Sequence, residues 1–132
     1  MLDISAQLGT FEENLHPNMM AWLIESWISP LIATNLIYLK MYPNTVPLYR
    51  SGVRYKEERF GEEDFFDIPT VLKQGHADCE DLAAWRIAEY LSVGYWAAPL
   101  VTWEMYDNGD ILFHVRVNTQ YGIEDPSARL GM

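Results

Sequence analysis

The first third of the chain carries apolar residues at helical spacing. The positions i, i+3, i+4 and i+7 of this stripe are Met20, Leu23, Ile24 and Trp27. Such spacing predicts one buried face of a helix over residues 17–27. Pro17 suits the first position of this helix, where a backbone N–H has no intrahelical acceptor.

A second helix is expected directly after the first. Ser29 is a favourable N-cap and Pro30 a favourable first residue, so we predict a helix over residues 30–40, ending before Tyr42. The apolar stretch 19–39 also raises the alternative of a membrane span. Because Glu25 interrupts it and Pro30 divides it, two buried helices are the preferred interpretation.

The middle of the chain has few regular signals. Residues 42–66 contain prolines, glycines and mixed charges, which favour an irregular, solvated connector. Residues 69–73 are compatible with a short helical turn, and Gly75 frees the backbone after it. A strong helix follows over residues 79–93, with Asp78 as N-cap, Asp81 in a capping-box-like position and Gly94 at the end. Its inward stripe comprises Cys79, Leu82, Ala83, Arg86, Ile87, Tyr90 and Leu91.

Alternating runs near the C-terminus predict an antiparallel meander. Strands are expected over residues 98–106 and 111–118, joined by the hairpin signal at residues 107–110, and a short third strand over 122–125. Helices followed by a meander give an α+β fold. By the two-residue period, Phe113 shares the apolar face of its strand, and His114 points to the other face. If the helix at Cys79 packs across that second face, His114 approaches the helix start and Asp125 lies beside it.

Composition narrows the class of protein. The chain has 132 residues, 49% of them hydrophobic, which fits one domain over 1–132, with a helical front at 1–45 and a catalytic-type core at 46–132. Its net charge of −10 and pI near 4.5 leave no basic stripe for nucleic acid, and they disfavour an anionic membrane surface. Residues 1–18 contain no Lys or Arg, so no export signal is expected. A single cysteine excludes an internal disulfide.

Three residues could carry chemistry. Cys79 at a helix start, His114 on a strand and Asp125 on the next provide a nucleophile, a general base and acid, and an orienting carboxylate. A helix N-terminus and a nearby imidazolium favour the thiolate, and backbone N–H groups there could hold an oxyanion. The acidic neighbours Asp78, Glu80 and Asp81 would raise the thiol pKa unless they point to solvent or to partners.

Simpler interpretations stay open for these residues. A lone cysteine in a buried stripe is often an inert core residue, and one histidine on a strand is usually structural. A metal site from His76, Cys79 and Asp81 matches no common spacing, so no metal and no cofactor are expected. Gln74 could supply an oxyanion-hole amide, and Arg86 is expected to pair with a buried carboxylate.

The motifs resemble a known family. Residues 75–86, GHADCEDLAAWR, are similar to the nucleophile motif of the transglutaminase-like cysteine peptidase superfamily. Residues 113–117, FHVRV, resemble its histidine strand, and residues 123–127, IEDPS, its terminal acid. Residues 67–88 and the ending 124–132 are similar to small members encoded in tailed-phage and prophage genomes. The resemblance covers about residues 46–132.

This resemblance implies a papain-like α+β fold with a triad of Cys79, His114 and Asp125. The implied function is a phage-encoded cysteine hydrolase that cleaves peptide or amide bonds through a thioester. Its substrate would be a peptide or protein, such as a phage structural protein or cell-wall peptide, and it would act in the host cytoplasm during assembly or in the virion. The alternatives are a catalytically silent virion structural or assembly protein, oligomeric in the particle, and an enzyme that joins glutamine to amines.

Overall fold

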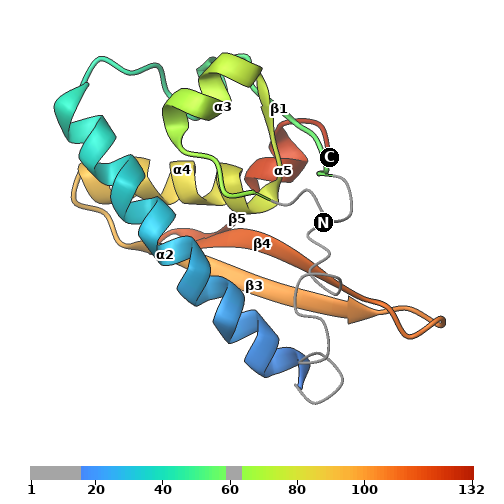
Figure 1. Cartoon of the computed structure of the whole chain (residues 1–132). Coiled ribbons are helices and arrows are strands. Elements are labelled where there is room, and N and C mark those ends of the chain that lie inside the picture. The colour runs from blue at the N-terminus through green and yellow to red at the C-terminus, as the bar shows by residue number, and fades with distance from the viewer. Residues whose placement is uncertain (1–15, 59–63) are drawn as a thin grey trace.

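The computed structural model describes residues 16–58 and 64–132, and in this part the chain is an α+β protein. Figure 1 shows the long helix α2 and the helix α4 packed against a three-stranded sheet, with the short helices α3 and α5 above it. The helices are α2 (Pro17–Met41), η2 (Leu48–Arg50), α3 (Ile68–Gln74), α4 (Cys79–Ser92) and α5 (Pro126–Arg129). The strands are β1 (Arg54–Tyr55), β2 (His76–Ala77), β3 (Ala97–Met105), β4 (Ile111–Thr119) and β5 (Gly122–Glu124).

The predicted break at Pro30 is wrong, because α2 continues through it as one helix. A proline at this position deprives only the Ser26 carbonyl of its donor, and both residues lie on the exposed face. Ser29 does not act as an N-cap; its hydroxyl donates to the Glu25 carbonyl at 3.1 Å. The buried stripe therefore runs unbroken along the helix through Met20, Ala21, Ile24, Ile28, Leu31 and Asn35.

By length and composition α2 could also cross a membrane. In the most apolar window of this helix, 39% is buried inside the protein, where α2 packs against α4 and β3. The expectation of no membrane partner stays a prediction. The expected absence of an export signal concerns residues 1–18, of which residues 1–15 lie outside the described part.

The connector over residues 42–66 is not a plain solvated loop. Its Leu48 and Val53 are buried in a second hydrophobic cluster, together with Trp85 of α4. The strand β1 pairs in parallel with β2, and the N–H of Tyr55 donates to the Leu130 carbonyl at 2.9 Å. Leu48 and Val53 thus belong to the core, and the backbone of the connector holds the end of the chain. Residues 59–63 lie outside the described part.

The predicted turn before Gly75 is a seven-residue helix, α3. The side chain of Asp67 caps it by accepting from Thr70 N at 3.2 Å. Gly75 ends it with a φ of 82°, a left-handed conformation that glycine adopts without strain. This turn directs the chain through β2 and into α4.

The meander is confirmed, with the order β3-β4-β5 and antiparallel pairing throughout. The helix α4, however, does not pack across the face of β4 on which His114 lies. Ala83 and Ile87 of α4 pack in one cluster with Phe113 and Val115, so the helix covers the apolar face of β4. The strand period could not decide this, since it distinguishes two faces without saying which one a helix covers.

Candidate functional site

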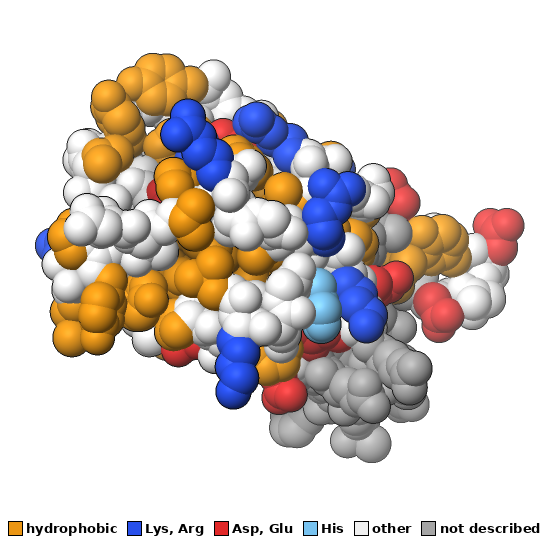
Figure 2. Space-filling view, turned by 90° about the horizontal axis from the view of Figure 1, so that it is seen from above, with side chains coloured by type: hydrophobic (Ala, Val, Ile, Leu, Met, Phe, Trp, Pro, Cys, Tyr) orange, Lys and Arg blue, Asp and Glu red, His pale blue; other side chains and the backbone are white. Residues whose placement is uncertain are grey.

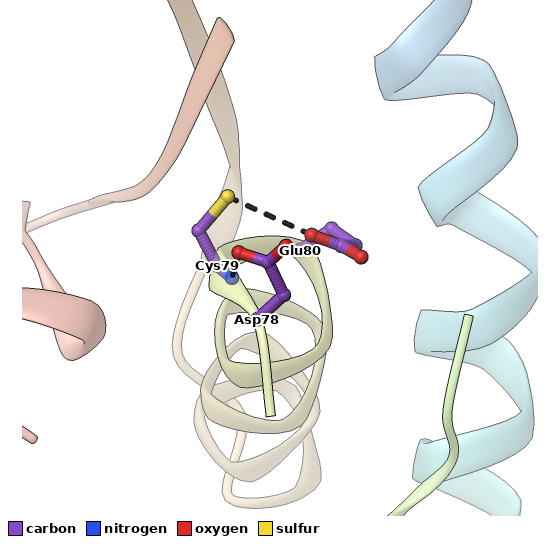
Figure 3. Close-up of side chains that lie close together, drawn as sticks. All are labelled: Asp78, Cys79 and Glu80. Carbon is purple, nitrogen blue, oxygen red and sulfur yellow. Dashed lines mark hydrogen bonds between the residues drawn. The ribbon is translucent and has the colours of Figure 1, made fainter. Parts of the chain in front are cut away.

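Cys79 is the first residue of α4, as the sequence predicted. Asp78 is the N-cap, and its Oδ1 accepts the Cys79 backbone N–H at 2.7 Å. Figure 3 shows the Cys79 sulfur pointing away from the helix axis, with the Glu80 carboxylate beside it. The sulfur lies 3.6 Å from Glu80 Oε2, which accepts the thiol proton. The cysteine therefore begins the helix with a carboxylate on each side of it in sequence.

The thiol of Cys79 is held in its neutral form. Its side chain is fully buried, and burial raises the thiol pKa well above the ordinary value. The negative charges of Glu80 and Asp78 raise it further, whereas a hydrogen bond from the backbone of Val115 acts in the opposite direction. The sulfur thus lies against β4, next to the residue that follows His114. The acidic neighbours do not point away to solvent, because both are buried.

His114 and Asp125 are brought together. His114 Nε2 lies 2.8 Å from Asp125 Oδ2, and Arg116 Nε lies 3.2 Å from the same oxygen. The other oxygen of Asp125 accepts the Ala128 N–H at 3.2 Å and so caps α5. Burial raises the pKa of Asp125, but the hydrogen bonds from His114 and Ala128 outweigh it and bring this pKa below the usual value. The carboxylate is therefore ionised and fixed in place.

The second nitrogen of the His114 imidazole makes no hydrogen bond to the described residues. Nδ1 of His114 is buried and has no hydrogen-bond partner among the described residues. Within this part of the chain no hydrogen bond joins Cys79 to His114. The structure thus assembles the histidine and the acid of the expected triad, and it places the cysteine sulfur beside the backbone of Val115, the residue that follows His114 in β4.

A groove of about 250 Å³ reaches the histidine from outside. It is lined by β3 and β4 and by the end of the chain, and Arg116 on its wall donates to Thr102 Oγ1 at 3.1 Å. The residues that line this groove are Thr102, Trp103, Glu104, Leu112, His114, Arg116 and Met132. It offers space for a small polar group or an extended backbone beside His114.

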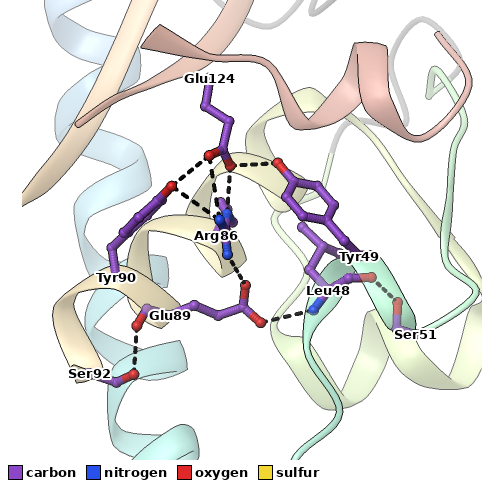
Figure 4. A network of polar contacts seen from close by, with 8 residues as sticks. All are labelled: Leu48, Tyr49, Ser51, Arg86, Glu89, Tyr90, Ser92 and Glu124. Atoms are coloured by element: carbon purple, nitrogen blue, oxygen red, sulfur yellow. Dashed lines mark hydrogen bonds and ion pairs between the residues drawn. The ribbon is translucent and has the colours of Figure 1, made fainter. Parts of the chain in front are cut away.

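Arg86 pairs with carboxylates, as predicted. Its Nε lies 2.5 Å from Glu124 Oε2 and its Nη1 lies 3.1 Å from Glu89 Oε1. Figure 4 shows Tyr49 and Tyr90 donating to the same Glu124 carboxylate from either side. The sequence did not predict these two tyrosines as partners, because Tyr49 and Glu124 are 75 residues apart. This network joins η2, α4 and β5.

The sequence also missed a buried group of carboxylates. Glu58, Glu80 and Asp81 each place one oxygen within 4.8 Å of the others. The one sequence signal was the pair of acids in the first turn of α4, of which Asp81 was predicted in a capping-box-like position. The described residues form a second group of candidate ligands, Asp78, Cys79 and Glu80, and His76 belongs to neither group. Gln74 is used locally, since its Nε2 donates to the His76 carbonyl at 2.8 Å.

Figure 2 shows one face of the surface, on which the Lys and Arg side chains are scattered among apolar and neutral ones. Comparison with known proteins adds no relative: no family model, curated protein or solved structure matches this chain.

Proposed function

We propose that this protein is a transglutaminase-like cysteine hydrolase that cleaves peptide or amide bonds with Cys79, His114 and Asp125. The observation that carries the proposal is the 2.8 Å contact between His114 Nε2 and Asp125 Oδ2, with Nδ1 of the same ring buried and unpartnered among the described residues. A carboxylate on one imidazole nitrogen fixes the ring and leaves the other nitrogen to exchange a proton with a nucleophile. A papain-like arrangement of helix and sheet belongs to the same proposal.

The chemistry would run in two halves. The Cys79 proton passes to His114 Nδ1, and the sulfur attacks the substrate carbonyl carbon, with backbone N–H groups at the start of α4 holding the oxyanion. The C–N bond then breaks as the imidazolium returns the proton to the leaving amine, which yields a thioester. Water attacks this thioester while His114 takes its proton, and the thiol leaves with that proton. Asp125 stays ionised throughout.

The environment of Cys79 sets two requirements. Because the side chain is fully buried, the side chains that cover the sulfur must move before a carbonyl can reach it. Because burial, Glu80 and Asp78 raise the thiol pKa, the thiolate forms only when a positive charge on His114 compensates them. The reactive form would therefore be a Cys79 thiolate paired with protonated His114, reached when the side chains that cover the sulfur move aside.

Alkylation of the native protein tests this proposal. Cys79 is the only cysteine, so iodoacetamide incorporation at cysteine reports on this residue alone. The Cys79→Ala variant measures the background incorporation at other residues. The rate of alkylation should show a component below pH 8 that disappears in His114→Ala and persists in His76→Ala, a control at a half-buried histidine outside the triad. A rate that rises only at high pH and is equal in both variants contradicts a Cys–His pair.

The wider biological role depends on the resemblance alone. The motifs resemble those of small phage-encoded members, so the proposed substrates are phage structural proteins or cell-wall peptides. The proposed site of action is the host cytoplasm during assembly, or the virion itself. Neither nucleic acid nor a membrane is part of this proposal.

A second candidate is a virion structural or assembly protein without catalysis. It is favoured by the buried, carboxylate-flanked Cys79 and by large apolar side chains exposed on α2, since aromatic residues and Met are enriched at interfaces. Trp22 is 62% exposed and Met41 is 65% exposed. Cys79→Ala should leave particle assembly unchanged if the protein is a hydrolase required only for cleavage, whereas Trp22→Ala should impair assembly if this surface is the functional one.

A further inference from the structure

Three acidic side chains converge beneath the first turn of α4. Glu80 and Asp81 belong to that turn, and Glu58 comes from the connector that follows β1. Glu80 and Asp81 have no exposed surface, and Glu58 is half-buried. One oxygen of each carboxylate lies within 4.8 Å of the others. Negative charges this close together repel strongly when they are buried away from water, so the three carboxylates require a compensating positive charge.

Each carboxylate uses one oxygen inside the protein and leaves the other unused. Asp81 Oδ1 accepts the Phe66 N–H at 2.8 Å, and Glu58 Oε2 accepts the Asp64 N–H at 2.8 Å. Glu80 Oε2 accepts from the Cys79 thiol at 3.6 Å. The remaining oxygens, Glu58 Oε1, Glu80 Oε1 and Asp81 Oδ2, are buried and have no hydrogen-bond partner among the described residues. Buried polar atoms rarely lack a hydrogen-bond partner, so these three oxygens point to a ligand that contacts all of them.

We propose that Glu58, Glu80 and Asp81 form a binding site for a divalent cation of the Ca²⁺ class. All three donors are carboxylate oxygens, which suit hard cations, whereas the nitrogen and sulfur ligands typical of zinc are not part of this set. Two oxygens on opposite sides of Ca²⁺, each about 2.4 Å from it, are about 4.8 Å apart. The oxygens lie within this limit of one another, and Ca²⁺ accepts irregular oxygen sets, whereas Mg²⁺ demands near-ideal octahedral geometry and loses its water reluctantly.

The alternative compensation is a shared set of protons. Burial raises the pKa of Asp81 to about 9 and that of Glu58 to about 7, so protons compete with any cation at neutral pH. Cation affinity is therefore best measured at pH 8, where fewer protons must be displaced. The site does not depend on catalysis by Cys79, and it would be present in a structural protein as well.

Thermal unfolding with and without cations tests the proposal. The full chain is treated with EDTA, dialysed at pH 8 and melted in increasing Ca²⁺, with Mg²⁺ in parallel. A cation that binds only the folded chain should raise Tm by about 10 °C at 100 times its Kd, and Ca²⁺ should act at lower concentration than Mg²⁺. Isothermal calorimetry should give one site per chain.

Two variants separate this site from general ionic effects. Glu80→Gln should abolish the Ca²⁺-dependent rise in Tm, whereas Glu104→Gln, at an exposed glutamate on β3, should retain it. If Glu80→Gln does not fold, Glu58→Gln at the half-buried edge of the cluster serves instead. Absence of both binding and a Tm change up to roughly 10 mM Ca²⁺, the weak end of protein calcium sites, overturns the proposal in favour of shared protons. A Ca²⁺ response that is equal in all variants overturns it as well.

Discussion

Arg86 of α4 and Glu124 of β5 form an ion pair with 2.5 Å between Nε and Oε2. The guanidinium carbon also lies 4.4 Å from the centre of the Tyr90 ring and 4.7 Å from that of Tyr49. Burial raises the pKa of Glu124, but the hydrogen bonds from Arg86, Tyr49 and Tyr90 outweigh it and bring the value below normal. One carboxylate thus connects the helix, the connector and the last strand.

Replacing Arg86 should lower the stability of the folded protein. Arg86→Met keeps much of the side-chain volume but leaves Glu124 and Glu89 without their cation, and we expect the free energy of unfolding to fall by about 2 kcal/mol. This lies below the cost of breaking a fully buried pair, because the side chains of Arg86 and Glu124 keep 22% and 16% of their surface exposed. Urea unfolding measures the change. Arg50→Met, at an exposed arginine, should stay within about 0.5 kcal/mol.

Asp125 has two structural roles that substitution can separate. Asp125→Asn keeps a carbonyl oxygen for the Ala128 N–H but loses the charge beside His114 and Arg116, so we expect a loss of about 1 kcal/mol. Asp125→Ala also removes the cap of α5, and a loss of about 2 kcal/mol is expected. Equilibrium unfolding at pH 7 compares the two variants. Equal losses would contradict the capping role.

The buried acids should make stability depend on pH. The pKa of Asp81 is about 9 in the folded chain and lower when unfolded, so folding retains a proton that the unfolded chain releases. The contribution of Asp81 to the free energy of unfolding is fully present below about pH 4. It is lost as the pH rises toward 9, by about 1.4 kcal/mol per pH unit for each proton. Unfolding in EDTA between pH 5 and 9 measures this slope.

The groups around the cluster define the control for that measurement. The charges of Glu58 and Asp78 raise the pKa of Asp81, and Glu80 interacts with the same carboxylate. Two further titratable groups, Cys79 and Tyr55, lie nearby. Asp81→Asn should flatten the slope, because it removes one retained proton, whereas Glu104→Gln should not. The lowered pKa of Asp125 has no effect in this range, since that carboxylate ionises below pH 4 in both states.

Pro30 should lower the free energy of unfolding, because it lies inside the helix α2. Pro30→Ala restores a donor for the Ser26 carbonyl within α2, and the gain is partly offset by the greater freedom of the unfolded chain. We expect a net gain of about 1–2 kcal/mol in the free energy of unfolding, measured in urea. Pro17→Ala is the matched control, because Pro17 begins the helix and deprives no carbonyl of a partner. A loss of stability in Pro30→Ala would contradict this reading of the helix.

Local signals predicted the elements near the proposed site well. Asp78 as N-cap, the helix from Cys79 and the hairpin before His114 were all found, because each depends on neighbouring residues. The continuity of α2 could not be predicted, since it depends on the exposure of Pro30 and Ser26, and exposure is a tertiary property. The face of β4 that α4 covers is a tertiary property too.

The acidic cluster escaped prediction for another reason. Charged residues are almost never fully buried, so no pattern in the sequence predicts the burial of Glu80 and Asp81. Their burial follows from packing between the connector and the start of α4. Glu58 lies more than 20 residues before them, and no local pattern indicates that it approaches. The sequence thus identified the residues of the proposed triad and missed those of the proposed cation site.

The three-stranded sheet has a further consequence through β3. Among the described residues this strand pairs only with β4, so its outer edge could recruit a strand from another molecule. Pro99 lies in this strand opposite Val117 and has no N–H to donate, which interrupts a continuous ladder along that edge. Edge-to-edge aggregation through the first half of β3 is therefore discouraged by a residue that takes no part in the chemistry.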